Sequence, residues 1–249
     1  MKKVRNKGKI AIVMPGYNVA KTVERTVKDI PRDLADNIIL VDDGSWDATS
    51  EVGKKLGLTV VRHKKNKGYG AAQKTGYKKA LSMGADIIVM LHPDYQYDPR
   101  LSEELVGLIK KGIADIMLGT RIRTRKEVLG GGMPVYKYLS NRFLTILENV
   151  VLGMNLGEYH TGYRAYTKEA LKKVKFQNFS DDFVFDGQML VVAAYKDLII
   201  GEIPVPVKYF AEASSISFKK SFKYGLETLV LLVRFIAAKT GIYKSKVFN

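Results

Sequence analysis

Polar residues follow an apolar run abruptly in IIVMLHPDYQYDP, residues Ile87 to Pro99. Comparable polar stretches follow two other apolar runs, PGYN at 15–18 and VDDGSWDAT at 41–49. The carboxylates that stand out in these stretches are Asp42, Asp43, Asp94 and Asp98. Gathered without a counter-ion they would repel one another, so a bound cation or an anchored sugar-nucleotide is expected. An ordinary polar turn is the alternative, because Pro and Asp end strands well.

Apolar runs rich in β-branched residues alternate with helical patterns along the first half of the chain. The runs cover 10–14, 38–41, 58–61, 87–91 and 115–119, and the helical patterns cover 19–30, 47–56, 69–83 and 100–111. This alternation predicts an α/β fold with a mostly parallel sheet that helices cover on both sides. Ligands of such sheets bind beyond the carboxyl ends of the strands. We therefore expect the three polar stretches to lie side by side along one edge.

The composition narrows the classes of function. None of the 249 residues is cysteine, which excludes disulfides and thiolate metal sites, and 46% are hydrophobic, enough for a sizeable core. The net charge of +16 favours an anionic partner, namely nucleic acid, acidic lipid or a phosphorylated ligand. Lys-rich surfaces also occur in thermophilic proteins. The basic and then apolar N-terminus has no small-residue cleavage site, so we interpret it as a first strand.

Two close glycines open a helical pattern in KGYGAAQKTGYKKAL, residues 67–81. Because a helix N-terminus favours anions, Lys67 and Gly70 are candidate nucleotide contacts, with Lys64 and Lys65 adding positive charge. The alternative is a glycine-rich helix start without a ligand. The sequence has no P-loop signature, and no Gly-x-Gly-x-x-Gly follows the first apolar run.

Six motifs occur in an order that is typical of one enzyme family: IVMPGYN, ILVDDGSWDAT, NKGYGAAQKTGY, DIIVMLHPDYQYDP, GTR and EYHTGYRAY. The sequence resembles the family 2 inverting glycosyltransferases of the GT-A fold, and is similar to their dolichol- and polyprenyl-phosphate sugar synthases. The resemblance implies a GT-A-like, Rossmann-related domain over residues 1–212 and a UDP- or GDP-linked sugar donor. The implied acceptor is a polyprenyl phosphate, or another lipid-linked or polysaccharide acceptor.

The resemblance also assigns donor-side roles residue by residue. It implies that Pro15, Tyr17 and Asn18 line the nucleotide pocket, and that Asp42 and Asp43 contact the base and the ribose.

A divalent cation, Mn²⁺ or Mg²⁺, is the cofactor that the resemblance implies. Asp94 stands at the last Asp of the family's Asp-x-Asp, and Gln96 follows it, whereas His92 replaces the usual first Asp. Mg²⁺ prefers oxygen ligands, while an imidazole suits Mn²⁺ or another transition metal. His92 is therefore either a ligand or a hydrogen-bonding spacer.

The stretch SDDFVFDGQML, residues 180–190, is the candidate acceptor side. By resemblance, Asp186 is our first choice for the base or an acceptor contact, and Asp182 the second, although Gln188 replaces a Glu of the family's motif. Helix capping is the favoured alternative for Asp181 and Asp182.

Acceptor chemistry decides whether a base is needed. A hydroxyl must lose a proton during attack, whereas a lipid phosphate monoester is largely ionised at neutral pH, since its second pKa is about 6. Arg121, Arg123 and Arg125 are candidates to position such a phosphate, and a solvated basic loop is the alternative. The resemblance also implies that three residues lie near the sugar or acceptor, namely His160, Thr161 and Arg164. The candidates for a sugar or acceptor contact are therefore Arg121, Arg123, His160, Thr161 and Arg164.

The C-terminal segment 213–249 is predicted to be a basic amphipathic helical tail. Apolar residues between 216 and 241 fall near helical spacing, with charged residues between them that make a membrane span unfavourable. An interfacial helix on an anionic membrane fits the pattern, and so does a helix packed on the domain or on a partner subunit, either a membrane subunit or a second copy.

We therefore expect a metal-dependent inverting glycosyltransferase, peripheral on the cytoplasmic face of the cell membrane. A catalytically impaired nucleotide-sugar-binding protein is one alternative, motivated by His92 and Gln188. A basic nucleic-acid-binding protein is a distant one, and no recognisable nucleic-acid motif supports it.

Overall fold

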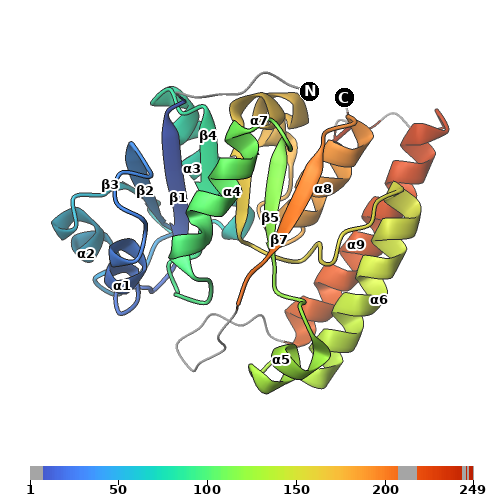
Figure 1. Ribbon diagram of the computed structural model, residues 1–249, viewed down its shortest axis with the longest axis horizontal. Helices are drawn as coiled ribbons and strands as arrows, with labels where there is room; N and C mark the ends of the chain where they lie inside the picture. Colours follow the sequence, from blue (N-terminus) through green and yellow to red (C-terminus); the bar gives the residue numbers. More distant parts are fainter. Residues whose placement is uncertain (1–7, 207–217, 243–244, 246, 249) are drawn as a thin grey trace.

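The computed structural model describes residues 8–206, 218–242, 245, 247 and 248, and these contain one seven-stranded sheet in the order β3-β2-β1-β4-β6-β5-β7 (Figure 1). Its strands are β1 (Ile10–Gly16), β2 (Asn37–Asp42), β3 (Thr59–Arg62), β4 (Ile87–Met90), β5 (Ile116–Thr120), β6 (Arg164–Thr167) and β7 (Ile200–Pro204). β6 runs antiparallel to β4 and β5, and the other pairs are parallel. The mixed, mostly parallel α/β sheet predicted from the sequence is confirmed.

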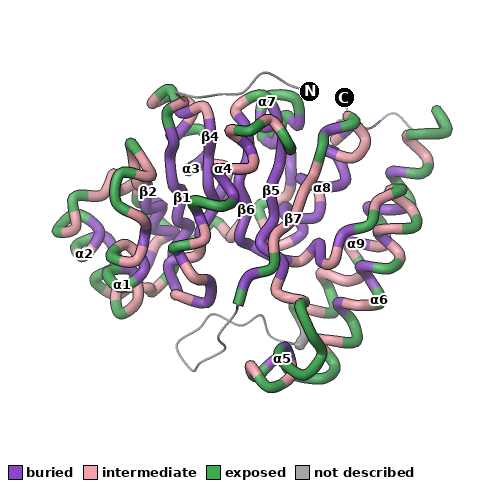
Figure 2. Tube along the Cα trace, viewed as in Figure 1, coloured by how far each residue is buried: buried purple, intermediate pink, exposed green. Residues whose placement is uncertain are grey.

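Helices cover both faces of the sheet, so the strands β1, β4, β5 and β6 bury their side chains on both sides, whereas the edge strands β3 and β7 are only partly buried (Figure 2). The helices are α1 (Val23–Lys28), α2 (Thr49–Lys55), α3 (Tyr69–Ser82), α4 (Ser102–Lys110), α5 (Arg125–Gly130), α6 (Val135–Leu152), α7 (Lys168–Val174), α8 (Phe185–Tyr195) and α9 (Phe218–Lys239), with 3₁₀ turns at Pro99–Leu101 and Phe176–Asn178. Residues of α3, α7 and α8 share one hydrophobic core with the sheet, and residues of α1 and α4 share the other. The elements that were not anticipated from the sequence include the helices α5, α6 and α7 and the strands β6 and β7.

The predicted helical tail corresponds to α9, which packs against α8 and α6. Leu231, Leu232 and Phe235 of α9 are buried in the same core as α8. The predicted division between residues 212 and 213 lies outside the described residues. Among the helices in the described part of the chain, none is long and apolar enough to cross a membrane.

Candidate active site

The carboxyl ends of the central strands meet at one edge of the sheet, as the sequence predicts. β1 pairs in parallel with β2, with Gly16 opposite Asp42, and with β4 on its other side. Because β6 is antiparallel to β4, Met90 lies opposite Arg164, the first residue of β6. The segment 158–163 is thereby brought to the edge at which β1, β2 and β4 end (Figure 1).

Asp42, at the end of β2, is fully buried and accepts hydrogen bonds from within the protein. Its Oδ1 accepts from the Ser45 amide (2.8 Å), its Oδ2 accepts from the Ser50 hydroxyl, and Arg62 lies 3.5 Å from Oδ2. Burial opposes ionisation, but the hydrogen bonds from Ser50 and Ser45 outweigh it and lower the pKa of Asp42. The carboxylate therefore holds the turn after β2 in place.

Asp43 fixes the loop that leads into α3. It accepts hydrogen bonds from the backbone amides of Lys67 and Gly68, both 2.9 Å long, and lies 2.6 Å from Nδ1 of His63. Gly68 has a φ of +104°, which favours glycine, so the loop turns sharply beneath this carboxylate. Any contact of Asp42 or Asp43 with a nucleotide remains a prediction, added to these internal roles.

The loops after β1 and β2 are joined to each other. The Asn18 amide donates to Ser45 Oγ (2.9 Å), and Asn18 Oδ1 accepts from the Trp46 amide (3.1 Å). Pro15 is buried within β1, whereas Tyr17 is 48% and Trp46 81% exposed. An exposed aromatic pair beside the strand ends is suited to stack on a base, and the sequence interpretation missed Trp46.

The start of α3 has a protein acceptor in place of the anion expected there. The amides of Gly70 and Ala71 both donate to the carbonyl of Asp181, at 2.8 and 3.3 Å. A Cβ at Gly70 would lie 2.5 Å from the Ser180 carbonyl oxygen, so this glycine permits close packing of two segments. The expectation that these amides receive a phosphate is therefore corrected, while Lys67 keeps an exposed side chain.

His92 contacts the acceptor-side carboxylate through one tyrosine. The Tyr69 hydroxyl donates to Asp186 Oδ2 (2.9 Å) and lies 3.0 Å from His92 Nε2. Since Tyr69 gives its one proton to Asp186, His92 Nε2 is the donor to Tyr69, and the neutral ring has its lone pair on Nδ1. Gly162 makes room for the ring, because a Cβ there would overlap His92 Nε2.

The predicted gathering of four carboxylates is wrong, because each is held separately. Asp98 accepts from the Arg100 guanidinium at 2.9 and 2.6 Å, and Oδ1 of the buried Asp94 accepts from the Gln96 amide (3.1 Å). Within the described residues, no group of three or more His, Cys, Asp or Glu side chains is arranged to hold a metal ion. A site of one or two protein oxygens still fits Mg²⁺ that is bound mainly by substrate phosphates, and Asp94 and Gln96 supply such oxygens.

Asp186 lies at the centre of a hydrogen-bond network. Its Oδ1 accepts from Gln73 Nε2 (2.9 Å), Gln73 accepts in turn from the Tyr77 hydroxyl (2.6 Å), and Tyr69 donates to Oδ2. The fully buried Arg164 donates to the Asp186 carbonyl (2.8 Å), with Nη1 3.8 Å from Oδ1. The predicted acceptor contact of Arg164 is thus corrected to positioning Asp186, and the sequence missed Tyr69 and Gln73.

Asp182 lies beside α9. Its Oδ2 accepts from Lys223 Nζ (2.7 Å), while Asp181 pairs with Lys74 of α3 at 2.6 Å. Helix capping is the alternative that the sequence favours for both carboxylates, but α8 begins after Val184 and neither of them caps it. Burial opposes the effect of Lys223, but the hydrogen bond from this lysine prevails and lowers the pKa of Asp182. The pairing indicates that Asp182 attaches α9 to the loop before α8.

Arg121 follows β5 and is held by a buried glutamate. Its side chain makes a two-pronged pair with Glu158, with Nε 2.9 Å from Oε1, and donates to the His160 carbonyl (2.7 Å). Asn141 of α6 donates to the same Glu158 oxygen (2.9 Å). Burial alone would raise the pKa of Glu158, but the Arg121 charge and its hydrogen bonds lower it.

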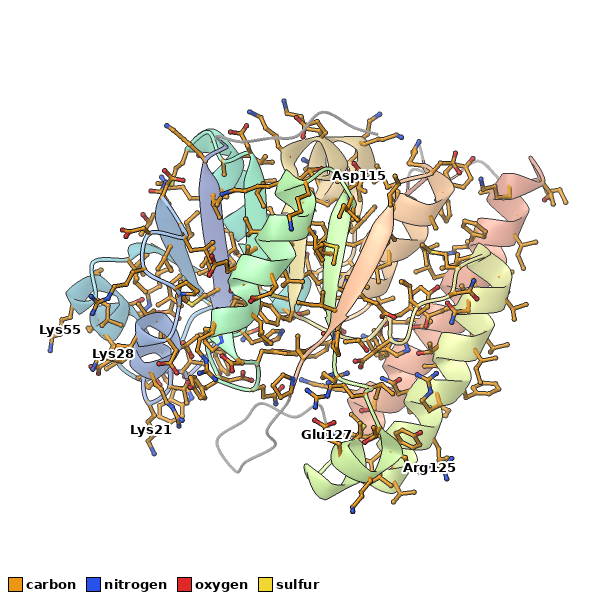
Figure 3. All side chains as sticks on the ribbon, in the orientation of Figure 1. Lys21, Lys28, Lys55, Asp115, Arg125 and Glu127 are labelled. Atoms are coloured by element: carbon orange, nitrogen blue, oxygen red, sulfur yellow. The ribbon has the colours of Figure 1, made fainter. Side chains whose placement is uncertain are left out.

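The side chains of Arg123 and Arg125, unlike that of Arg121, do not line the cavity described below. Arg123 pairs with Glu127 one helical turn on (3.0 Å), and both side chains are 40% exposed. Arg125 and Glu127 belong to α5, below the carboxyl edge of the sheet in the view of Figure 3, whereas Asp115 marks the opposite, amino end of β5. The predicted phosphate contact of Arg123 is therefore corrected to a surface ion pair.

His160 and Thr161 also have partners within the protein. His160 Nδ1 lies 2.8 Å from the Tyr224 hydroxyl of α9, and Nε2 lies 3.2 Å from the buried Glu148 of α6. The fully buried Thr161 donates to the Gly119 carbonyl (2.6 Å). The predicted contact of Thr161 is corrected, because its buried side chain fixes the segment before β6. His160 joins α6 to α9 and also borders the cavity described next, so its acceptor contact stays a prediction.

A cavity of about 520 Å³ opens between the strand ends and the helix pair α6–α9. Its polar lining includes Tyr69, His92, Gln96, Arg121, Lys137, His160 and Asp186, and its apolar lining includes Met133, Phe143, Leu144, Phe222, Leu226 and Leu229. The strand-end side of the cavity therefore supplies the Asp186 network, and the side formed by α6 and α9 supplies most of its apolar lining. Sequence reasoning brought His92, Gln96, Arg121, His160 and Asp186 to this cavity and missed Tyr69 and Lys137.

Comparison with known proteins assigns the family. The family described as glycosyl transferase family 2 matches residues 11–175. The chain belongs to this family. It is a glycosyltransferase that takes its sugar from a nucleotide-sugar donor.

Relatives of this glycosyltransferase span most of its length. The UDP-N-acetylglucosamine–dolichyl-phosphate N-acetylglucosaminyltransferase of Methanococcus voltae is 30% identical over 217 residues, covering 80% of this chain and 86% of that protein. The low-salt glycan biosynthesis hexosyltransferase Agl6 of Haloferax volcanii is 27% identical and covers 79% and 47%. A similar fold occurs in glucosyl-3-phosphoglycerate synthase of Mycobacterium tuberculosis, with a TM-score of 0.72, 20% identity and coverage of 97% and 83%.

Proposed function

We propose that this glycosyltransferase moves a sugar from a UDP-linked donor to the phosphate of a polyprenyl phosphate, with inversion and with the help of a divalent cation. One observation carries the proposal: a single cavity joins the Asp186 network to an apolar wall between α6 and α9. An acceptor with an ionic head and an apolar chain fits both sides of that cavity. A GDP-linked donor and a glycan acceptor are the alternatives that the test below distinguishes.

Two relatives support the donor and the cofactor. The M. voltae relative is named for a UDP-sugar and dolichyl phosphate, and the M. tuberculosis synthase has been crystallised with UDP and either Mn²⁺ or Mg²⁺. In this chain Asp94 and Gln96 would hold the cation, with His92 Nδ1 as a further donor if the ion is Mn²⁺. Bound there, the cation would stabilise negative charge on the departing diphosphate.

Two cations at the cavity favour an anionic acceptor head. Arg121 and Lys137 both line the cavity, and burial together with the charge of Arg121 lowers the pKa of Lys137. The two like charges are close enough to repel each other, so a phosphate between them would relieve that repulsion. Glu158 and the His160 carbonyl take the Nε and Nη2 hydrogens of Arg121 and fix its guanidinium at the cavity, so a phosphate there would meet the charge of this group.

The state of Asp186 also favours an ionised acceptor. Both of its carboxylate oxygens already accept hydrogen bonds, from Gln73 and Tyr69, and Arg164 is close by. These bonds fix the carboxylate in one orientation, which suits a group that positions Tyr69 and His92. A phosphate monoester needs no base at neutral pH, since its second pKa is about 6.

The reaction then balances without a proton transfer. An oxygen of the acceptor phosphate attacks the anomeric carbon, a new carbon–oxygen bond forms on the opposite face, and the bond to the nucleoside diphosphate breaks. The nucleoside diphosphate leaves with the electron pair. Asp186, through Tyr69, keeps His92 in one orientation beside this centre, while Arg121 and Lys137 hold the attacking phosphate.

The test is transfer by the purified protein from UDP-GlcNAc, UDP-glucose or GDP-mannose, each with Mn²⁺, Mg²⁺ or EDTA. The acceptors are a short-chain polyprenyl phosphate, the matching polyprenol, 3-phosphoglycerate and a free oligosaccharide, with products identified by mass spectrometry. We expect a sugar phosphoprenol from one UDP-sugar, formed only with a cation. Transfer to the oligosaccharide or to 3-phosphoglycerate alone would refute the lipid acceptor.

A further inference from the structure

We infer that α6 and α9 together form one face that rests on an anionic lipid bilayer, so that the cavity mouth opens onto the membrane surface. Sequence reasoning considered only the C-terminal tail for this role. The inference goes beyond the transfer reaction and does not require the proposed acceptor to be correct.

Helix α6 carries an exposed apolar stripe along its whole length. Val135, Leu139, Phe143, Ile146 and Val150 follow one another at intervals of three or four residues and are each at least 57% exposed. This spacing places them on one side of the helix, opposite the buried residues that face the protein. A helix packed on a domain needs only its inner side to be apolar, so the outer stripe requires a different explanation.

Helix α9 has the same construction. Its buried side includes Leu231, Leu232 and Phe235, whereas Phe222, Leu226, Val230, Val233 and Ile236 form an outer stripe, each at least 48% exposed. The two helices pack against each other and stand together at one side of the molecule (Figures 1 and 2). Eleven of the sixteen large apolar side chains that are exposed among the described residues lie on these two helices.

The charges that border the stripes favour lipid as the occupant. Lys220 and Arg234 of α9 and Arg125 and Lys126 of α5, which contacts α6, are exposed. Lys223 pairs with Asp182 and Glu227. The chain as a whole carries a net charge of +16. An apolar stripe bordered by lysine and arginine is the pattern of helices that lie in the interface of a bilayer with anionic headgroups.

The face is continuous with the cavity. Tyr136, Phe143, Phe222 and Leu226 are exposed and also line the cavity, so its mouth opens between the two stripes. A protein resting on this face would meet an amphiphilic acceptor at the bilayer surface. Its apolar chain could stay in the lipid while its head reaches Arg121.

The experiment is co-sedimentation of the full chain with vesicles of phosphatidylcholine alone or mixed with phosphatidylglycerol, at low and high salt. One variant, Leu139→Ser/Ile146→Ser/Val150→Ser, changes α6 outside the cavity, and a second, Val230→Ser/Val233→Ser/Ile236→Ser, changes α9. Ile113→Ser/Ile199→Ser removes exposed apolar side chains elsewhere and serves as the matched control. Thermal melting confirms that each variant folds.

We expect binding to the anionic vesicles, weakened by salt, and at least a tenfold loss of partitioning in both the α6 and the α9 variant but not in the control. Unchanged vesicle binding of the α6 variant would refute the inference that both helices form the membrane-binding face. Absence of vesicle binding by the wild-type chain would refute it as well. A wild-type dimer that the α6 variant dissociates, without vesicle binding, would assign the face to a second copy. Transfer to a water-soluble short-chain phosphate should survive in the α6 variant, which separates this outcome from failure of the proposed reaction.

Discussion

The strand-end loops (residues 16–20, 42–50 and 63–68) and the cavity beside α6 and α9 both contain buried carboxylates, but they hold them differently. In the loops, Asp42 and Asp43 accept from backbone amides and from hydroxyl or imidazole groups of nearby residues. Asp186, which lines the cavity, and Glu158, which lies buried behind Arg121, accept mainly from side chains of distant elements, namely Tyr69, Gln73 and Arg121.

The two kinds of carboxylate have different effects. A carboxylate that accepts from backbone amides fixes the conformation of a loop, and so the shape of the surface that a nucleotide would meet. A carboxylate that holds other side chains fixes the directions in which their donors and charges point. Substitutions of Asp42 or Asp43 should therefore act mainly through stability, and a substitution of Asp186 mainly through turnover. A substitution of Glu158 should act through stability as well, because Glu158 also accepts from the Arg121 amide.

The largest expected effect is on the cation. Asp94→Ala should lower kcat/KM by about 10³-fold, because charge on the departing diphosphate would lose its stabilising ion. Turnover with titrated Mn²⁺ measures this loss. Asp98→Ala, four residues away in the same stretch, removes the ion pair with Arg100 and the hydrogen bond from the Arg100 amide, but Asp98 does not line the cavity, so turnover should stay within about twofold. Equal losses in both variants would mean that Asp94 has no special part in holding the cation.

Glu158→Gln tests how much stability the cavity's buried pair contributes. Removing one partner of a buried ion pair should lower the free energy of unfolding by about 3 kcal/mol at pH 7, measured by urea denaturation. Because the folded-state pKa of Glu158 is below its ordinary 4.5, the charged carboxylate stabilises the protein above that pH, and the contribution is lost as pH falls through the lowered value.

The difference between wild type and Glu158→Gln should accordingly shrink below pH 4.5. Glu103→Gln changes an exposed acid on α4 and should show neither the loss nor its pH dependence. A constant difference from pH 7 to pH 3 would show that Glu158 acts through packing and not through its charge.

Asp186→Asn sharpens the distinction between a base and a positioning group. We expect kcat to fall by about 10²-fold, because the Tyr69 hydroxyl loses the carboxylate that orients it and, through it, His92. The pH profile of kcat/KM should keep a single rise near pH 6, which comes from ionisation of the acceptor phosphate. Asp182→Asn, which changes only the pair with Lys223, should stay within about twofold. Disappearance of the acidic limb in Asp186→Asn would make Asp186 the base and the acceptor a hydroxyl.

Sequence patterns anticipated the sheet edge well, because buried parallel strands have a strong apolar signal and their polar ends must share an edge. They did not anticipate β6, whose four residues Arg164–Thr167 contain no apolar run, or α6. The spacing of Leu139, Phe143, Ile146 and Val150 did contain a helical signal for α6.

The side-chain partners were harder to predict than the elements. Tyr69 and Gln73 lie four residues apart on one side of α3, a spacing visible in the sequence, but Asp186 is more than a hundred positions further on. Arg121 and Arg123 are equivalent in the sequence, but Arg121 pairs with the buried Glu158 whereas Arg123 forms a surface pair with Glu127. Partners joined across the fold leave no local pattern.

The smallest expected effect concerns the room that Gly162 leaves for His92. Gly162 has no positive φ, so alanine suits its backbone, and the main conflict of a new Cβ is with the imidazole, with a lesser one at 3.1 Å from the Tyr69 hydroxyl. Gly162→Ala should therefore displace the ring from Tyr69 and lower kcat by about tenfold with little change in melting temperature. Gly107→Ala on α4, where a Cβ meets nothing within 4 Å, is the control. In a His92→Ala background, Gly162→Ala should lower kcat no further, because its effect on kcat requires the imidazole ring. An equal loss of kcat in both backgrounds would mean that the substitution instead disturbs the backbone before β6.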